Sequence, residues 1–340
     1  MKNKLFIVTL EPIEQRYTKQ WYYYFKHKFS FHFDVEYIDG DYIDDKIESG
    51  CFLDINKTNI YKSQQIVKIA KMFQCKKIND NDLFLFMDAW HYGITALKYM
   101  AQLNKINIKI FGFWHAGTYD CFDFISQAGL NKWASFNEAG WFKALDGSFV
   151  ATNFHKKLIL DYFGKDVQHK KIHVVGFPMD WQEEINSRVK EYKEKENIIV
   201  FPHRLDYEKQ PEVFDKLSKE FPNYKFIKTL EITKNKKEYY ELLQKAKFVF
   251  SASLQETFGI GTVEAMFLDC VPLVPDRLSY VELYDKSFRY ENKNFNDCVK
   301  KLYDMILHYN EYLVKLKENK TKIKRESLGA ILRMVEVMKR

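Results

Sequence analysis

Residues 248–284, FVFSASLQETFGIGTVEAMFLDCVPLVPDRLSYVELY, contain the pattern that decides the fold of this chain. FVFSA is a short apolar run that predicts a strand, and TVEAMFLD carries apolar residues at helical spacing. CVPLV predicts a second buried strand bounded by prolines. The turn before the helix contains Gly259 and Gly261. The stretch therefore predicts one β-α-β unit with a glycine-bearing turn at the start of its helix.

The same turn predicts a site for an anion such as phosphate. At the start of a helix the backbone N–H groups lack intrahelical partners and the helix dipole favours negative charge. Such turns also occur simply for packing, but here Glu256 and Glu264 flank the turn. Because carboxylates repel phosphate, this pair indicates a ligand that also carries neutral hydroxyls, such as a ribose and a sugar. A nucleotide-sugar fits that description.

Two motifs carry a resemblance to a known group of enzymes. The spacing of Glu256 and Glu264 resembles the E-x7-E motif of retaining glycosyltransferases with the GT-B fold. Upstream, FPHRLDYEKQPEVF is similar to the Arg-x4-Lys segment of that group, and its basic residues are Arg204 and Lys209. The resemblance implies that these two side chains clamp the donor diphosphate. It also implies an α/β fold with two Rossmann-like domains facing across a cleft and a C-terminal helix crossing back to the first domain.

Length and composition agree with a two-domain enzyme. A chain of 340 residues is long enough for about two domains. We expect an acceptor-binding domain at 1–178, a donor-binding domain at 179–320 and a C-terminal helix at 321–340 that packs back on the first domain. The boundary falls at Gly176 to Pro178, just before a charged helical segment. The composition, 46% hydrophobic and 17% aromatic, excludes global disorder.

The sequence predicts a cytoplasmic protein, in the host cytoplasm if a phage encodes it. No apolar run has the length needed to cross a bilayer, and MKNKLFIVTLEP is too quickly polar for a signal peptide. The cysteines are scattered singly, which argues against a disulfide framework and a zinc site. We expect no metal and no cofactor beyond the donor. The cysteines are Cys51, Cys75, Cys121, Cys270 and Cys298.

The net charge of +7 favours an anionic partner. The excess of 53 Lys and Arg over 46 Asp and Glu is spread along the chain. The alternative to an anionic partner is that the lysines reflect only an AT-rich genome and lie on solvated faces that need no ligand.

Several side chains follow predicted strands of the first half, where open α/β sheets bind ligands. Arg16 and Thr18 follow KLFIVTL and either touch the donor or cap the next helix. Asp39-Gly-Asp41 spells an Asp-x-Asp pair, which we interpret as surface turn chemistry and not a metal site. Residues 40–59 show no clear period and predict a long loop.

The next two strands end on polar and aromatic residues. NDLFLFMDAWHYG predicts a strand followed by Asp88 and Trp90, and IKIFGFW is followed by HAGTYD. His115 resembles the residue with which retaining GT-B enzymes reach the donor sugar; a structural histidine is the alternative. Aromatic rings at such strand ends can stack on an acceptor base.

The acceptor is indicated by two further resemblances. Residues of the second half, ETFGIGTVEAMFLDCVPLVPDRLSYVELY with FPHRLDYEKQPE, look like enzymes that attach mannose to queuosine in transfer RNA. EPIEQRYTKQW, TNIYKSQQI, DAWHYGITALKYM and WHAGTYDCFDF look like bacteriophage glycosyltransferases that decorate hydroxymethylated pyrimidines in DNA. Both imply a nucleobase acceptor, DNA first and transfer RNA second. No membrane partner is expected, and the oligomeric state is open.

The resulting hypothesis is a retaining glycosyltransferase that uses a UDP-sugar or a GDP-sugar, UDP being favoured. The expected catalytic residues are His115, Glu256 and Asp120. The expected donor-binding residues are Arg204, Lys209, Gly259, Ile260, Gly261, Thr262, Glu264, Arg16 and Thr18. The expected acceptor-binding residues are Asp88, Trp90, Trp114 and Tyr119. Asp88 or Asp120 would bind or deprotonate the acceptor hydroxyl.

Two other functions stay open at this point. An enzyme that acts on envelope glycans or lipids would use the same donor site, but no amphipathic basic helix is evident in the first half. A nucleic-acid-binding protein on an inactive transferase scaffold would be expected to lose some of Arg204, Lys209, Glu256 and Glu264, and all four are present.

Overall fold

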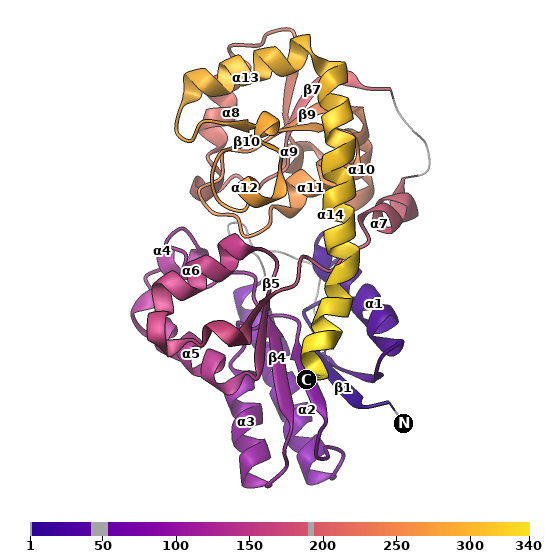
Figure 1. The fold of residues 1–340 in the computed structure, drawn as a ribbon, viewed down its shortest axis with the longest axis vertical. Helices are drawn as coiled ribbons and strands as arrows, with labels where there is room; N and C mark the ends of the chain where they lie inside the picture. The colour runs from indigo at the N-terminus through magenta and orange to yellow at the C-terminus, as the bar shows by residue number, and fades with distance from the viewer. Residues whose placement is uncertain (1, 42–53, 190–193) are drawn as a thin grey trace. The chain divides into compact units, whose positions relative to one another are not determined.

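The computed structural model describes residues 2–41, 54–189 and 194–340 (Figure 1). The chain divides into two compact units. Unit 1 comprises Met1–Pro178 together with Gly329–Arg340, and unit 2 comprises Met179–Leu328.

Unit 1 is built on a six-stranded parallel sheet in the order β2-β1-β3-β4-β5-β6. Its strands are β1 (Lys4–Val8), β2 (Asp34–Ile38), β3 (Leu83–Phe86), β4 (Lys109–Phe113), β5 (Gly147–Val150) and β6 (Ile172–Val174). Its helices are α1 (Tyr17–Ser30), α2 (Ile55–Gln74), α3 (Gly93–Leu103), α4 (Phe124–Gln127), α5 (Asn131–Ala144) and α6 (Asn153–Phe163). The order changes direction between β1 and β3, so loops leave the carboxyl ends of these two strands in opposite directions.

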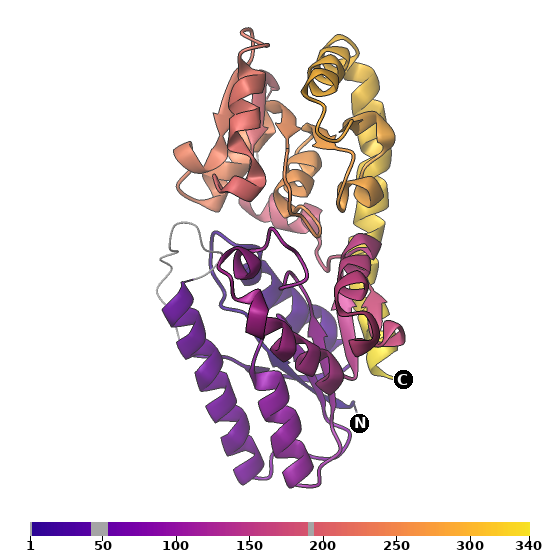
Figure 2. The same cartoon turned by 90° about the vertical axis from the view of Figure 1, so that its left-hand side faces the viewer.

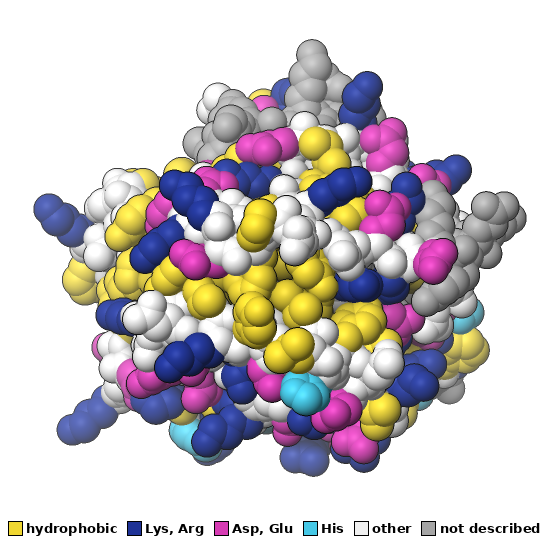
Figure 3. Space-filling view, turned by 90° about the horizontal axis from the view of Figure 1, so that it is seen from above, with side chains coloured by type: hydrophobic (Ala, Val, Ile, Leu, Met, Phe, Trp, Pro, Cys, Tyr) yellow, Lys and Arg dark blue, Asp and Glu magenta, His cyan; other side chains and the backbone are white. Residues whose placement is uncertain are grey.

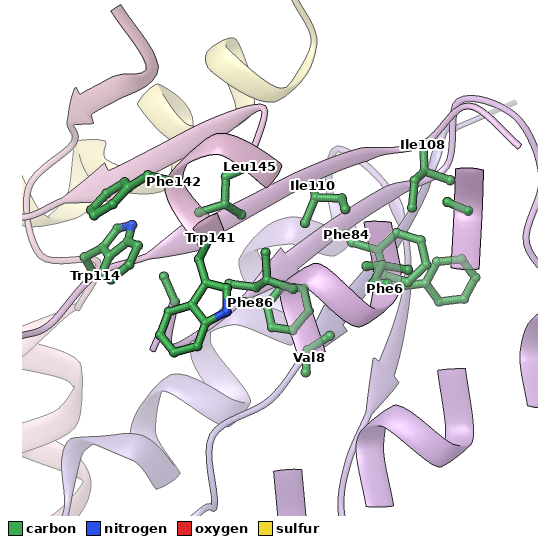
Figure 4. Packing of buried hydrophobic residues seen from close by; sticks show 14 of the residues in the cluster. Phe6, Val8, Phe84, Phe86, Ile108, Ile110, Trp114, Trp141, Phe142 and Leu145 are labelled. Atoms are coloured by element: carbon green, nitrogen blue, oxygen red, sulfur yellow. The ribbon is translucent and has the colours of Figure 1, made fainter. Parts of the chain in front are cut away.

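The core of unit 1 explains the near-continuous apolar runs in the sequence. Parallel strands covered by helices on both faces are buried on both sides, which selects apolar residues at every position. Phe6, Phe84, Phe86 and Ile110 are fully buried in one cluster (Figure 4). Helices α2 and α3 pack against each other beside it, and both Figures 1 and 2 show them side by side.

Unit 2 has a five-stranded parallel sheet in the order β11-β10-β9-β7-β8. Its strands are β7 (Glu196–Phe201), β8 (Lys225–Lys228), β9 (Ala246–Phe250), β10 (Val271–Pro275) and β11 (Arg289–Tyr290). Its helices are α7 (Trp181–Arg188), α8 (Pro211–Ser218), α9 (Thr229–Ile232), α10 (Lys236–Lys245), α11 (Ile260–Phe267), α12 (Tyr280–Leu283) and α13 (Phe295–Leu307). The predicted β-α-β unit is β9-α11-β10, and the strand order reverses between β7 and β9.

The secondary structure differs from the sequence-based expectation at three places. Helix α2 begins at Ile55, inside the stretch predicted as a loop; residues 42–53 of that stretch lie outside the described residues. Asp54 accepts a hydrogen bond from Lys57 N (2.8 Å) and starts the helix. Beyond Lys228 the sequence TLEITKNKKEYYELLQKAK favours one helix, but the structure has two, α9 and α10. Asn235 Oδ1 accepts from the Glu238 amide (2.9 Å) and thereby starts α10 as a separate helix.

The C-terminal helix α14 (Tyr309–Met338) is continuous, whereas the sequence pattern favours two helical segments, 295–316 and 327–337, with the helix that packs back on the first domain at 321–340. The basic stretch between the two segments is rich in Lys and Glu, which are good helix formers, and contains neither Pro nor Gly. The last residues of the chain contact unit 1: Arg333 donates to the Val175 carbonyl from Nε (2.9 Å) and from Nη2 (2.7 Å).

Candidate functional site

The predicted anion turn lies at the carboxyl edge of the unit 2 sheet, where the strand order reverses. Gly259 caps α11 with a positive φ of 83°, which favours glycine. A Cβ on Gly261 would lie 2.9 Å from the Pro202 carbonyl oxygen, so only glycine lets α11 approach the loop after β7 this closely. The first amides of α11, from Ile260 through Gly261 to Thr262, are the ones for which the sequence predicts an anion.

Buried hydroxyls hold this turn in place. Thr262 is fully buried, and its hydroxyl donates to the Gly259 carbonyl (2.8 Å). The Tyr284 hydroxyl donates to Thr262 Oγ1 (2.9 Å). Thr262 can therefore offer a ligand its backbone amide, while its side chain is committed to the turn.

Lys209 joins the loop after β7 to the loop after β9. It is only 6% exposed and donates to the Gln255 carbonyl (2.6 Å) and to Glu256 Oε1 (3.0 Å). The Leu254 amide also donates to the Glu208 carbonyl (2.7 Å). Lys209 and Glu256, which are far apart in sequence, thus form one buried ion pair at the carboxyl edge of the unit 2 sheet.

Arg204 lies in the same loop but is more exposed. Its guanidinium pairs with Asp206 (3.1 Å) and with Glu208 (2.8 Å), and its side chain keeps 26% exposure. These carboxylates fix the orientation of the guanidinium. A guanidinium is planar, and its N–H groups can donate two parallel hydrogen bonds to a phosphate.

Glu264 has a more buried position than its partner Glu256. It is 2% exposed and accepts from Lys236 Nζ and from the Tyr240 hydroxyl (3.0 Å), both on α10. Burial, with Glu264 adding to it, raises the pKa of Tyr240 well above its ordinary value, so this tyrosine stays a donor. Sequence reasoning missed Lys236 and Tyr240, because nothing in the motif points to α10.

In unit 1, the loops after β1, β3 and β4 bring several of the predicted residues together. His115 accepts from the Tyr17 hydroxyl at Nδ1 (3.1 Å) and donates from Nε2 to the Met87 carbonyl (2.9 Å). Burial lowers its pKa from the ordinary value, so the ring is neutral and fixed in one tautomer. The ring of Trp21 packs against it at 5.1 Å.

Asp88 is a partly exposed carboxylate held by a buried lysine. Lys62 of α2, buried at 6% exposure, holds it at 3.3 Å and also donates to the Trp90 carbonyl (2.7 Å). The Trp90 amide donates to Asp88 Oδ1 (3.0 Å). Lys62 was not identified as a site residue from the sequence, because the helical period of its segment predicts a helix but not which side chains face the site.

Glu138 fixes the loop that carries the other predicted acceptor residues. It is fully buried and accepts from Trp90 Nε1 (2.8 Å), from the Thr118 amide (2.9 Å) and from the Thr118 hydroxyl (2.7 Å). Burial raises the pKa of this carboxyl. Glu138 thus ties α5 to the loop after β4 and positions Trp90, which keeps a partly exposed ring.

Three predicted contact residues are buried and present almost no surface to a ligand. Trp114 is fully buried and stacks on Phe142 at 4.0 Å (Figure 4), so the prediction that it stacks on a base is wrong. Tyr119 is 5% exposed, with its hydroxyl bonded to His155 Nε2 (2.7 Å). Thr18 is fully buried and accepts from the Ile13 amide (3.2 Å), so its side chain braces the loop.

The remaining predicted residues are accessible to different degrees. Arg16 precedes α1 and is partly exposed, without a side-chain bond that caps the helix. Asp120 is 6% exposed and accepts from the Phe122 amide (3.0 Å), which shapes a turn. Asp39 accepts from the hydroxyls of Thr9 (2.6 Å) and Tyr22 (3.0 Å). Within the described ranges, no three or more His, Cys, Asp or Glu side chains are grouped as a metal site, and no helix could cross a membrane.

Comparison with known proteins connects the chain to glycosyltransferases. No protein-family model matches it. The tRNA-queuosine alpha-mannosyltransferase of Drosophila melanogaster is 26% identical over 167 residues, which is 46% of this chain and 42% of that protein. The chain thus spans less than half the length of this curated relative. The predicted resemblance to queuosine mannosyltransferases is confirmed at that level, and the resemblance to phage enzymes stays a prediction.

The fold has solved counterparts over its whole length. The sucrose-phosphate synthase of Thermosynechococcus elongatus has a TM-score of 0.67 at 10% identity, covering 99% of this chain and 98% of that one. The catalytic domain of starch synthase IV from Arabidopsis thaliana, bound to ADP and acarbose, has a TM-score of 0.63 at 9% identity and covers both chains completely. The chain has the GT-B glycosyltransferase fold, as its motifs predict.

Proposed function

We propose that the protein is a retaining glycosyltransferase that moves a sugar from a nucleotide-sugar to a hydroxyl group on a modified nucleobase. The observation that supports this most directly is the buried Lys209–Glu256 ion pair, with Arg204 in the same loop as Lys209 and the glycine turn of α11 at the same edge of the sheet. Two cations and the helix amides suit a diphosphate, and the carboxylate suits the hydroxyls of the sugar.

Charge stabilisation is the main catalytic task at this site. Negative charge develops on the leaving diphosphate as the bond to the sugar breaks, and preorganised donors stabilise that charge more than they stabilise the bound substrate. Arg204 and the α11 amides would serve this role. In unit 1, Asp88 would accept the proton of the acceptor hydroxyl, because its carboxylate is partly exposed and the buried Lys62 holds it in place.

The nucleobase acceptor is supported by the mannosyltransferase relative and by the net charge of +7. The positive charge does not form one continuous patch on every face. On the face shown in Figure 3, Lys and Arg side chains are interspersed with Asp and Glu around an apolar area. Four acidic side chains, Asp88, Asp120, Asp123 and Glu138, surround Tyr119 in this part of unit 1, and they would repel phosphate there. We therefore expect this part of unit 1 to receive the base, with the flanking phosphates held elsewhere.

The donor is tested first, without any acceptor. UDP-sugars and GDP-sugars are added to the protein, and thermal stability and slow donor hydrolysis are recorded. A true donor at a hundred times its dissociation constant should stabilise the fold by about 2.7 kcal/mol. Labelled sugar is then offered with DNA containing hydroxymethylcytosine or hydroxymethyluracil, with queuosine-bearing transfer RNA and with unmodified DNA. Label on none of them, with hydrolysis intact, would exclude the nucleobase and leave a glycan or lipid acceptor.

The two glutamates of the motif should behave differently when changed to glutamine. Glu256→Gln should mainly lower kcat, because a contact to the reacting sugar can strengthen as charge develops. Glu264, which we propose as the residue that holds the ribose of the donor, makes a contact that ground and transition states share, so Glu264→Gln should mainly raise KM. It should also lower the melting temperature, because Lys236 is buried at 8% exposure and would lose its charged partner. Equal changes of kcat and KM in both variants would contradict this division.

A further inference from the structure

His203 is buried in the donor site, yet half of its imidazole is unused. It directly precedes Arg204 and is 6% exposed. Its Nδ1 lies 3.6 Å from Glu256 Oε1, the oxygen that also accepts from Lys209. Its Nε2 is buried without a hydrogen-bond partner in the structure. A buried polar atom of this kind lowers stability and calls for a reason.

The charge state of the ring follows from its surroundings. Burial, with smaller contributions from Lys209 and Arg204, lowers the pKa of His203 to about 4 although Glu256 acts in the opposite direction. The imidazole is therefore neutral at pH 7 and carries a single proton. With the proton on Nε2, the lone pair of Nδ1 would face the Glu256 carboxylate and repel it. With the proton on Nδ1, the N–H group faces Glu256 Oε1 and attracts it, so the second tautomer is favoured.

Resting on the proposed function, we infer that His203 is a positioning residue that holds Glu256 toward the donor sugar through its Nδ1–H. Glu256 Oε1 accepts a hydrogen bond from the Lys209 ammonium at 3.0 Å, and the imidazole Nδ1 lies 3.6 Å from the same oxygen, where an N–H dipole attracts the carboxylate without a full hydrogen bond. Together they fix the carboxylate in one rotamer without a second cation beside it. Phe201 keeps the imidazole plane in place, with the two rings edge to face at 5.0 Å.

The tautomer is tested without any substrate. In protein labelled with ¹⁵N-histidine, the signals of His203 are assigned by their loss in His203→Gln. At pH 7 we expect a protonated Nδ1 and an unprotonated Nε2. A protonated Nε2, or a doubly protonated ring, would overturn the inference whether or not a donor is known.

Two isosteric variants test the role itself. The amide nitrogen of asparagine lies where Nδ1 does, and that of glutamine lies where Nε2 does. His203→Asn should keep kcat within a few fold of the unchanged protein, whereas His203→Gln should lower it by roughly tenfold, the loss expected when a catalytic group is misplaced. The KM for the donor should change little in either. Equal losses in both variants would contradict a role through Nδ1.

A double-mutant cycle with Glu256→Gln separates action through Glu256 from an independent effect. If His203 acts through the carboxylate, His203→Gln should lower kcat little further in the Glu256→Gln background. Losses that multiply would overturn the inference. Donor hydrolysis by the unchanged protein tests the proposed function separately. A protein that hydrolyses no donor would contradict the proposed function, whereas losses that multiply in the cycle would contradict only the role of His203.

Discussion

Replacing Arg204 with alanine is expected to lower turnover of the nucleotide-sugar by about a hundredfold or more, the loss seen when one preorganised partner of a transition-state charge is removed. The side chain is 26% exposed, and Asp206 and Glu208 hold the guanidinium by ion pairs. Its two ion pairs are partly exposed, and such pairs contribute about 0–1 kcal/mol to stability. The fold should therefore survive. Initial rates at saturating donor and a thermal melt measure both quantities.

A matched control lies in the same unit. Arg188 also pairs with a glutamate four residues away in sequence, Glu184, and its side chain is 21% exposed. Arg188→Ala should change stability about as much as Arg204→Ala and should leave turnover unaffected. Full turnover in Arg204→Ala, or an equal loss of turnover in Arg188→Ala, would contradict the proposal that Arg204 binds the donor diphosphate.

The positions of the proposed donor-site residues were largely predictable, because these residues lie in two short motifs. Gly259, Gly261 and Glu256 needed only the recognition of one strand-turn-helix, and the structure places them at one sheet edge. The partners that set their geometry were not predictable. Lys236 meets Glu264 through α10, and His203 meets Glu256 across two loops, so both contacts depend on how the sheet folds.

The acceptor residues were less predictable for a related physical reason. A sequence shows that an aromatic ring follows a strand, but not to which side the loop turns it. Trp114 turns into the core against Phe142, whereas Trp90 stays partly exposed because Glu138 holds its indole nitrogen. Both rings follow a buried strand in the same way. Only the packing of α5 distinguishes them.

The same reasoning separates the two carboxylates proposed as acceptor base. Asp120 is 6% exposed and shapes a turn by accepting from the Phe122 amide. Asp88 is more exposed, at 17% for its side chain, and the buried Lys62 pairs with it. A base must reach the acceptor hydroxyl before it can take the proton. Asp88 is the more accessible of the two carboxylates.

Asp88→Asn should therefore lower transfer to the acceptor by about 10²- to 10⁴-fold, the usual contribution of a positioned general base. Asp120→Asn, the comparison variant, should cost far less. The fold of Asp88→Asn should persist, because asparagine keeps an oxygen for the Trp90 amide and Lys62 keeps the Trp90 carbonyl as acceptor at 2.7 Å. Donor binding, measured by thermal stabilisation, should be unchanged, since the donor contacts are proposed for unit 2. A large loss in Asp120→Asn with normal transfer in Asp88→Asn would reverse the assignment.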